Sequence, residues 1–437
     1  MPTIAFYTLG CRSNQYETDV MSRQASSLGF EIVPYRAAAD IYVINTCTVT
    51  GNAGKKSRNY IRQAKKMNPN AKVIATGCDV EIDNIPEADL ILPNKDKSKL
   101  SSYLKPLISS NSSRSSFRLP VRANLMIEDG CENFCSYCIV PFVRGKVRSR
   151  PVKVILDEAR EMVKAGVKEI VLTGINIGEF GMEPETKRLG SISHAELVSA
   201  SQTLKQVQGD TKEPRLQSQV HHLVMLIALL SKIKGLLRIR LSSIEPQYVT
   251  DELVETIKNN PKVCHHLHMP LQSGDDGVLK AMKRRYTAKG FCDLVSGVRK
   301  KIKDIAITTD IIVGFPGETE QAFKNTRKLI EKIKFSRLHI FSYSDRPGTA
   351  ASKLNNKVDS KIIGKRYDLL TKIRVKQMLS FDKRYKGKLV EVLVESRNKS
   401  GKYEGLTGNY IRVGLSGPLI IGELHKARLN LSDIMIT

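Results

Sequence analysis

Short apolar runs alternate with amphipathic segments through the first quarter of the chain. The runs TIAFYTL, IYVINTC and AKVIATGC have the length of buried strands, and the segments QYETDVMSRQASSLGF and GKKSRNYIRQAKKMNPN between them have helical spacing. Strands alternating with helices predict a parallel α/β sheet. The polar stretch LISSNSSRSSFRLP then predicts a boundary near residue 115, so that the first domain covers residues 1–110.

Strand and helix signals alternate again over residues 117–355. The candidate strands are ANLMIED, EIVLTGIN, LRIRLSSIE, CHHLHMPLQ, ITTDIIVGF and RLHIFSYS. Six βα units predict an open, partial (βα)6 barrel with its active site at the carboxyl ends of the strands. Residues 186–219 interrupt this pattern because they are polar and too long for an ordinary βα connection. We expect them to form an outward surface insertion, disordered or partly helical, whose deletion leaves activity unchanged.

The end of the chain, residues 373–437, has a different pattern. Short apolar runs broken by Gly, Asn and Ser follow a lysine-rich helix, and they predict a small β-barrel. Tyr403, Tyr410 and Arg412 in this basic segment suit RNA binding, although barrels of this size also serve as plain interaction modules.

Charge adds a partner to this picture. The 437 residues include 70 Lys and Arg against 44 Asp and Glu, a net charge of +26, which favours nucleic acid over mere solubility. No apolar run approaches the ~20 residues that span a bilayer, and the N-terminus has no secretory pattern. We therefore expect a cytoplasmic protein with no membrane contact, in which eight cysteines are not a disulfide framework.

Three cysteines form a compact motif in the segment DGCENFCSYC. Cys131, Cys135 and Cys138 have the spacing C-x3-C-x2-C. A [4Fe–4S] cluster takes one thiolate per iron when its site is complete, so three thiolates leave one iron open to a substrate. The alternative is a zinc site with a borrowed fourth ligand, for which this spacing is poor.

A second trio is dispersed along the first domain. Cys11, Cys47 and Cys78 each follow a predicted strand, in TLGC, INTC and ATGC. Because parallel strands end at one edge of a sheet, the three thiols can converge on a second cluster; the alternative is coincidence. Asn14 and Asn45 are further candidates to donate hydrogen bonds to the cluster sulfides.

The cysteine motif, with Tyr137 before its last cysteine, resembles that of radical S-adenosylmethionine enzymes. The whole chain apart from the insertion resembles the tRNA methylthiotransferases, and the C-terminal domain resembles their TRAM domain. The phrases that carry the resemblance are TLGCRSNQYETDVM, NTCTVT, ATGC, DGCENFCSYCIVPFVRGKVRSR, TGINIG, RIRLSSIEP, HMPLQSGDD, DIIVGFPGET and HIFSYSDRPGT. LGCRSNQYET and DRPGTAA are closer to the branch acting on N6-threonylcarbamoyladenosine at tRNA position 37, and the isopentenyladenosine branch is the competitor.

The resemblance implies conversion of adenine C2–H into C2–SCH3. Cys131, Cys135 and Cys138 would hold the [4Fe–4S] cluster that reduces S-adenosylmethionine, and the second trio would hold the auxiliary [4Fe–4S] cluster that carries the sulfur. Two S-adenosylmethionine molecules would serve, one as methyl donor and one as the source of a 5′-deoxyadenosyl radical. An external one-electron donor and a sulfur source are implied, and no catalytic side chain beyond the cluster ligands.

The residues that contact the cofactor can be proposed only from their positions in these motifs. The candidates for S-adenosylmethionine, each with a capping or turn role as its alternative, are Thr173, Gly174, Asn176, Ser243, Glu245, Gln272, Ser273, Gly314 and Gly317. The basic tract RGKVRSR, residues 144–150, could neutralise phosphates of a tRNA anticodon loop, where a base leaves its stack at low cost, and solvated loop charge is the alternative. Two rivals remain: a radical enzyme acting on a non-RNA substrate, and a non-catalytic iron–sulfur protein that binds RNA.

Overall fold

The computed structural model describes residues 1–107, 119–181 and 214–435. The chain folds into two compact units. Unit 1 comprises residues 1–119, 129–147 and 344–352, and unit 2 comprises residues 120–128, 148–343 and 353–437. The predicted boundary near residue 115 and most of the predicted insertion, residues 186–213, lie outside the described residues.

A five-stranded sheet forms the core of unit 1. Its order is β2-β1-β3-β4-β5, and all of its neighbouring strands run parallel. The strands are β1 (Thr3–Thr8), β2 (Glu31–Val33), β3 (Ile41–Thr46), β4 (Lys72–Gly77) and β5 (Leu90–Leu92). Every residue of the central strand β3 is buried, as expected for a strand covered on both faces. The predicted parallel α/β domain is confirmed.

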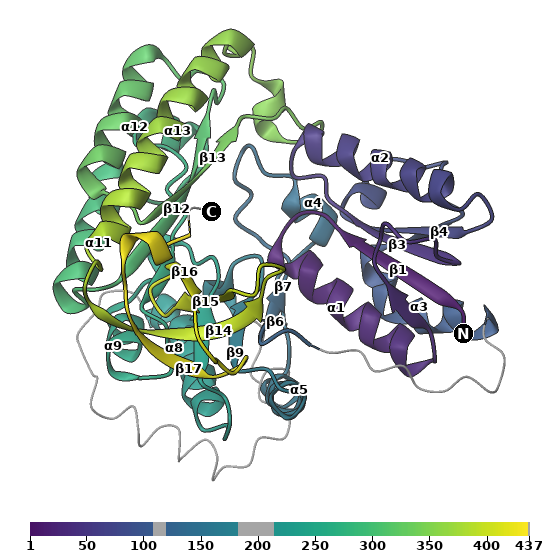
Figure 1. Ribbon diagram of the computed structural model, residues 1–437. Coiled ribbons are helices and arrows are strands. Elements are labelled where there is room, and N and C mark those ends of the chain that lie inside the picture. The colour runs from purple at the N-terminus through teal and green to yellow at the C-terminus, as the bar shows by residue number, and fades with distance from the viewer. Residues whose placement is uncertain (108–118, 182–213, 436–437) are drawn as a thin grey trace. The chain divides into compact units, whose positions relative to one another are not determined.

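Helices cover both faces of this sheet (Figure 1). On one face, α1 (Arg12–Ser27) and α3 (Leu100–Leu104) place Met21, Ala25 and Leu100 against the strands. On the other face, α2 (Gly51–Met67) contributes Ile61 and Ala64. Unit 1 also contains α4 (Val140–Arg144), which follows the first cysteine trio, and the short strands β7 (Glu128–Asp129) and β8 (Arg148–Ser149) flank that loop in the chain.

Six strands of unit 2 form two three-stranded parallel sheets. One set has the order β10-β9-β6 and the other β11-β12-β13, and single bridges between Ile239 and Val263 and between Ser243 and His268 join the sets. The strands are β6 (Arg122–Met126), β9 (Glu169–Thr173), β10 (Arg238–Leu241), β11 (His266–His268), β12 (Ala306–Val313) and β13 (Arg337–Ser342). The predicted open array of six βα strands is confirmed.

Helices alternate with these strands along the chain. They are α5 (Val152–Lys164), α8 (Pro214–Ser231), α9 (Asp251–Asn259), α10 (Asp276–Ala281), α11 (Ala288–Lys301), α12 (Glu320–Ile333) and α13 (Ser360–Lys383). Threonine caps several of them by accepting a backbone hydrogen bond, as Thr250, Thr287 and Thr319 do. Helix α8 begins inside the predicted insertion, so the end of that segment is helical. No helix in the described part of the chain is long and apolar enough to cross a membrane.

The C-terminal strands form a four-stranded antiparallel sheet with the order β16-β15-β14-β17, as the prediction of a small β domain requires. The strands are β14 (Leu389–Arg397), β15 (Tyr403–Thr407), β16 (Arg412–Leu415) and β17 (Leu424–Arg428). The sheet is tied to the barrel by Arg238, whose guanidinium donates to the carbonyls of Leu406 and Glu391 at 2.6 and 2.9 Å. Tyr410 stacks on His266 with ring centroids 4.5 Å apart, so part of its ring is used for docking rather than for RNA.

Candidate metal centres and cofactor site

The second cysteine trio lies at one edge of the unit 1 sheet. Cys47 and Cys78 come directly after the neighbouring strands β3 and β4, and Cys11 comes three residues after β1. The backbone N–H of Cys78 donates to the carbonyl of Thr46 at 3.1 Å, which fixes the two strand ends together. Cys47 and Cys78 are each 4% exposed. The sheet topology thus places all three thiols where ligand sites form in parallel sheets.

The space between these cysteines requires small residues. A Cβ on Gly10, which has φ +95°, would lie 2.8 Å from Cys47 Sγ. A Cβ on Gly77, with φ +99°, would lie 2.3 Å from the carbonyl oxygen of Thr46. Soft thiolate donors in a glycine-lined cradle are the ligand set that iron–sulfur clusters use, so the residues present fit a cluster.

Two asparagines brace this site from within the protein. Asn14 Nδ2 donates to the carbonyls of Leu9 and Thr46 at 2.8 and 2.9 Å. Asn45 Nδ2 donates to the carbonyl of Asn14 at 2.9 Å and to Thr18 Oγ1 at 3.1 Å. Because both amide N–H groups are used on the framework, the expectation that they donate to cluster sulfides is wrong; they hold the cysteine-bearing loops instead.

Burial and neighbouring charge act on the thiols of this trio. Burial raises the pKa of Cys47 to about 12, and the nearby Cys78 and Cys11 add to the shift. Burial also raises the pKa of Cys78, while Arg144 and Lys97 oppose it. Three thiolates that converge would repel one another, and the positive charge of a bound metal would offset this repulsion and keep the ligating thiols deprotonated.

The first trio lies in a tight loop of the same unit. The N–H of Cys131 donates to the carbonyl of Gly145 at 3.1 Å, and that of Cys138 to the carbonyl of Cys135 at 3.0 Å. Asn133 Nδ2 donates to Cys131 Sγ at 3.4 Å. Gly130 has φ +87°, and a Cβ there would lie 2.1 Å from the carbonyl oxygen of Lys146. These bonds bend residues 131–138 into a tight loop that carries the three thiols.

The basic tract after this loop is less exposed than its sequence suggests. Arg144 is only 4% exposed and bonds Asn14, Glu17 and Asp129. Arg150 donates to the Met126 carbonyl at 2.6 Å and to Glu158 at 2.7 Å. The expectation that the tract faces phosphates is therefore wrong for Arg144, whereas Arg150 is partly exposed and Lys146 and Arg148 are exposed.

The end of β9 carries the first group of cofactor candidates. Thr173 is fully buried. The N–H of Asn176 donates to Glu128 Oε1 at 2.7 Å, and a Cβ on Gly174 would lie 1.9 Å from that same oxygen. Asn176 Oδ1 accepts from the N–H of Glu245 at 3.4 Å. This turn joins the ends of β9 and β10 around the carboxylate of Glu128, a residue that the sequence alone did not single out.

The end of β10 carries Ser243 and Glu245. Ser243 pairs with His268 across a bridge to β11, and Glu245 forms an ion pair with Arg284. Burial raises the pKa of Glu245, and the Arg284 guanidinium opposes the shift. Arg284 also donates to the Tyr286 hydroxyl at 2.9 Å. The two residues thus lie beside the Asn176 turn, with Glu245 held by a buried arginine.

The remaining candidates lie after β11 and β12. Gln272 has φ +64°, and its N–H donates to the carbonyl of Asp310 at 2.8 Å. Ser273 Oγ is engaged by Thr326 Oγ1 at 3.2 Å. A Cβ on Gly314 would lie 2.3 Å from Ile363, and one on Gly317 would lie 2.6 Å from Asn356. The spaces beside the two glycines are therefore filled by the chain that leads into and begins α13.

Several of these candidates present polar atoms that the described part of the protein leaves unpaired. They are Thr173 Oγ1, Asn176 Nδ2 and Gln272 Oε1, and all three are buried. Buried polar atoms are usually paired, so these three are available to a partner of another kind. A bound polar ligand at this end of the sheet would supply such partners, which fits a nucleoside-type cofactor there.

One array at the same sheet was not anticipated from the sequence. Asp310 on β12 lies 3.2 Å from His268 Nε2 and 3.3 Å from His339 Nδ1, and His268 Nδ1 contacts Thr308 Oγ1 at 2.9 Å. The two histidine rings stack with centroids 5.4 Å apart. The period of two along each strand puts these side chains on one face, but the pairing of the strands was needed to see it.

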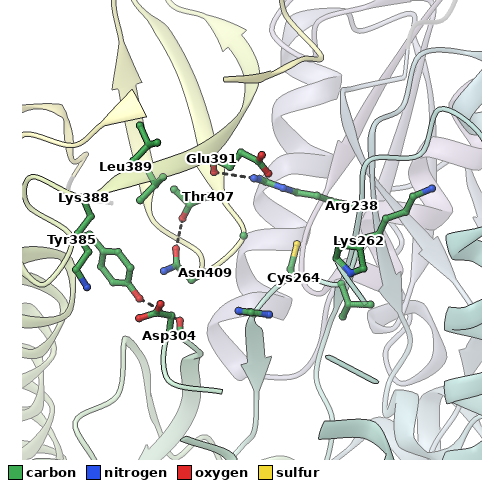
Figure 2. Close-up of a pocket in the computed structure, with 15 residues that line it drawn as sticks. Arg238, Lys262, Cys264, Asp304, Tyr385, Lys388, Leu389, Glu391, Thr407 and Asn409 are labelled. Carbon is green, nitrogen blue, oxygen red and sulfur yellow. Dashed lines mark hydrogen bonds between the residues drawn. The ribbon is translucent and has the colours of Figure 1, made fainter. Parts of the chain in front are cut away.

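A cleft at the opposite end of the barrel strands is framed by the C-terminal sheet (Figure 2). It has a volume of about 290 Å³ and is lined by Arg238, Cys264, Asp304, Tyr385 and Asn409, among others. The hydroxyl of Tyr385 donates to the Asp304 carbonyl at 3.2 Å. Active sites of βα barrels form at the carboxyl ends of the strands. We therefore attribute this cleft to the packing of the C-terminal sheet against the barrel and not to the active site.

Two known families match parts of the chain. Residues 126–330 match the radical SAM superfamily, and residues 3–92 match the uncharacterized protein family UPF0004. The first match contains Cys131, Cys135 and Cys138, and the second contains Cys11, Cys47 and Cys78.

Curated relatives match over nearly the whole length. The threonylcarbamoyladenosine tRNA methylthiotransferase MtaB of Bacillus subtilis is 34% identical over 98% of this chain and 94% of its own. That of Thermotoga maritima is 35% identical over 98% and 94%. The tRNA-2-methylthio-N(6)-dimethylallyladenosine synthase of Clostridium perfringens is 32% identical over 97% and 94%.

A solved structure shares the fold. The radical S-adenosylmethionine methyltransferase TsrM of Kitasatospora setae, solved with cobalamin and a [4Fe–4S] cluster, is 12% identical and has a TM-score of 0.52 over 80% of this chain and 77% of its own. At this identity the similarity concerns the fold alone.

Proposed function

Because the chain belongs to the tRNA methylthiotransferase family of radical S-adenosylmethionine enzymes, and to its threonylcarbamoyladenosine branch, we propose that it methylthiolates C2 of N6-threonylcarbamoyladenosine at position 37 of tRNA. The observation that carries the proposal is the presence of two cysteine trios in one chain that matches these relatives from end to end. The names of these relatives give threonylcarbamoyladenosine in tRNA as their substrate.

The two trios have different tasks in this proposal. Cys131, Cys135 and Cys138 would hold a [4Fe–4S] cluster with one open iron, and the second trio would hold an auxiliary [4Fe–4S] cluster that carries the sulfur. When bound, the first cluster and S-adenosylmethionine supply a carbon radical and a methyl group, the chemistry needed at an unactivated C2–H. Two S-adenosylmethionine molecules are used in each turnover.

The protein's own side chains and turns would bind and orient S-adenosylmethionine. The turn from Thr173 to Asn176, held by the Glu128 carboxylate, would bind one end of S-adenosylmethionine. Glu245, fixed by Arg284, would accept hydrogen bonds from ribose hydroxyls, since a carboxylate accepts two such bonds well. Cys47, Cys78 and Cys131 are buried, whereas Cys11 is exposed, so bound substrate would have to complete the exclusion of water from a reactive radical.

The partners follow from the reaction. They are a tRNA anticodon loop, an external one-electron donor and a source of sulfur, and the cytoplasm is where the tRNA would be met. The positive net charge of +26 and the antiparallel C-terminal sheet support RNA as the substrate.

The dimethylallyladenosine branch is the second candidate, because relatives of that name reach 32% identity over 97% of this chain. The test is anaerobic turnover of the reconstituted protein with two tRNAs, one carrying threonylcarbamoyladenosine and the other isopentenyladenosine, followed by nucleoside mass spectrometry. The proposal requires the methylthio product from the first tRNA. Product from the second tRNA alone would assign the activity to the dimethylallyladenosine branch. Product from neither tRNA would refute the proposed function.

A further inference from the structure

The segment that follows the first cysteine trio forms part of the wall around the second. Ile139 and Val143 pack against Cys78 in one buried cluster. Asn94 Nδ2 donates to the carbonyl of Val143 at 3.1 Å, which ties α4 to the sheet domain. The next residue, Arg144, is 4% exposed. All of these residues belong to unit 1.

Arg144 reaches the cysteine-bearing loops through Asn14. Arg144 Nη2 donates to Asn14 Oδ1 at 2.5 Å, and Cys11 Sγ lies 3.7 Å from that oxygen. Asn14 Nδ2 donates to the carbonyl of Thr46, the residue before Cys47. One guanidinium therefore fixes the amide that braces two of the three loops.

The charges around Arg144 are balanced and shielded from water. Arg144 Nη1 bonds Glu17 Oε1 at 3.0 Å and Asp129 Oδ1 at 2.7 Å, and Lys97 pairs with Glu17. Two cations thus face two carboxylates. Their side chains are between 1% and 17% exposed, so loss of one charge leaves an excess that solvent screens weakly.

We propose that Arg144 is a positioning residue of the second cluster site: through Asn14 it fixes the cysteine loops, and its charge favours the one-electron reduced state of the cluster. The inference rests on the proposed function, which puts a [4Fe–4S] cluster on Cys11, Cys47 and Cys78. In the reduction the cluster gains one electron from a one-electron donor, no bond breaks, and the added negative charge is what Arg144 stabilises. Net charge and hydrogen bonds near a cluster set its potential.

The test measures the potential of the second cluster by itself. The parent protein carries Cys131→Ala, Cys135→Ala and Cys138→Ala, and it is reconstituted anaerobically and titrated with dithionite and mediators under electron paramagnetic resonance. Arg144→Met should disfavour reduction at least tenfold, a fall of about 59 mV for one electron. Arg144→Lys keeps the charge, so its potential should fall by less than half as much as that of Arg144→Met.

Two further variants complete the design. Glu17→Gln removes a negative charge from the same network and should raise the potential. Arg62→Met removes an arginine that is 57% exposed and pairs with Glu87 in the same unit, and it should leave the potential at the parent value. If Arg144→Met does not retain the cluster, the potential of Glu17→Gln alone decides whether the charge of this network acts on the cluster.

The outcomes separate the inference from the function it rests on. Potentials of Arg144→Met and Glu17→Gln that equal the parent value overturn the inference while the second cluster stands. A lower potential in Arg62→Met of the same size as in Arg144→Met also overturns it, because the effect would then be general. A parent that binds no iron refutes the second cluster itself, and the inference with it.

Discussion

Neutralising Glu169 should destabilise the barrel and the C-terminal sheet together. Glu169 and Arg240 are both fully buried, and Arg240 Nε donates to Glu169 Oε1 at 2.6 Å. Arg240 also donates to the carbonyls of Thr407 and Gly408, each at 3.1 Å. Glu169→Gln keeps the shape of the side chain and removes its charge, so a buried guanidinium keeps only neutral partners.

The expected loss in free energy of unfolding follows from the burial of the Glu169–Arg240 pair. Burial opposes ionisation of Glu169, but Arg240, Arg122 and Arg238 outweigh it and lower its pKa, so the carboxylate is charged at neutral pH. Two unit charges 4 Å apart attract by about 4 kcal/mol at an effective dielectric constant of about 20. Removing one partner of a buried pair costs about 3–5 kcal/mol, and we expect Glu169→Gln to lower the free energy of unfolding by that amount.

Hydrogen exchange measured by mass spectrometry gives the free energy locally, which suits a chain of two compact units. Peptides that cover β9, β10 and β15 should lose protection, and peptides that cover β3 should not. Glu87→Gln, at the half-exposed pair with Arg62, is the matched control and should change stability by less than about 1 kcal/mol.

A double-mutant cycle tests the cause. Arg240→Met by itself leaves Glu169 buried without its closest partner, with Arg238 Nη1 4.0 Å away, whereas the double variant removes both charges of the pair. The double variant should be more stable than the sum of the single losses predicts, with a coupling of about 2 kcal/mol. Additive losses, or a loss below about 1 kcal/mol for Glu169→Gln, would refute the reasoning.

Three further predictions concern the cofactor end, acid stability and RNA. Gly174→Ala should push the Glu128 carboxylate aside and weaken S-adenosylmethionine binding by equilibrium dialysis, whereas Gly297→Ala, in open space, should not; equal affinities would contradict this. Burial opposes ionisation of Asp310, but His268 and His339 outweigh it and hold its pKa well below the ordinary value. The stability that the Asp310 carboxylate contributes is present above the ordinary value of about 3.9 and is lost as pH falls below it. The melting temperature of Asp310→Asn should therefore fall less than that of the parent between pH 6 and pH 3, and parallel curves would disprove the assignment. Finally, tRNA affinity should fall linearly with salt on a double-logarithmic plot, and an affinity independent of salt would exclude phosphate contacts.

The sheets were predictable because their signals are local. Continuous apolar runs such as the one over β3, buried at every position, identify parallel strands without any knowledge of tertiary structure. The positions of Cys11, Cys47 and Cys78 after successive strands then follow from topology, because neighbouring parallel strands end at the same edge of a sheet.

Side-chain networks were not predictable, since they depend on which segments meet. Arg144 belongs to a tract of basic residues that resembles a solvated or phosphate-facing surface, yet it is buried against Asn14 and Glu17, more than one hundred residues earlier in the chain. Asp310 and His339 meet because β12 and β13 pair in one register. The acidic residue directly before the cysteine loop was the available signal for Glu128, but a carboxylate beside a loop has too many possible roles to be assigned from sequence.

The central claim is that two separate clusters occupy the two cysteine trios, and iron content tests it most directly. Iron and sulfide are measured after anaerobic reconstitution of the parent protein and of a variant with Cys11, Cys47 and Cys78 all replaced by alanine. The parent should hold about eight irons and the variant about four, as two four-iron clusters require. About four irons in both proteins would contradict the second cluster, and the methylthiolation chemistry with it.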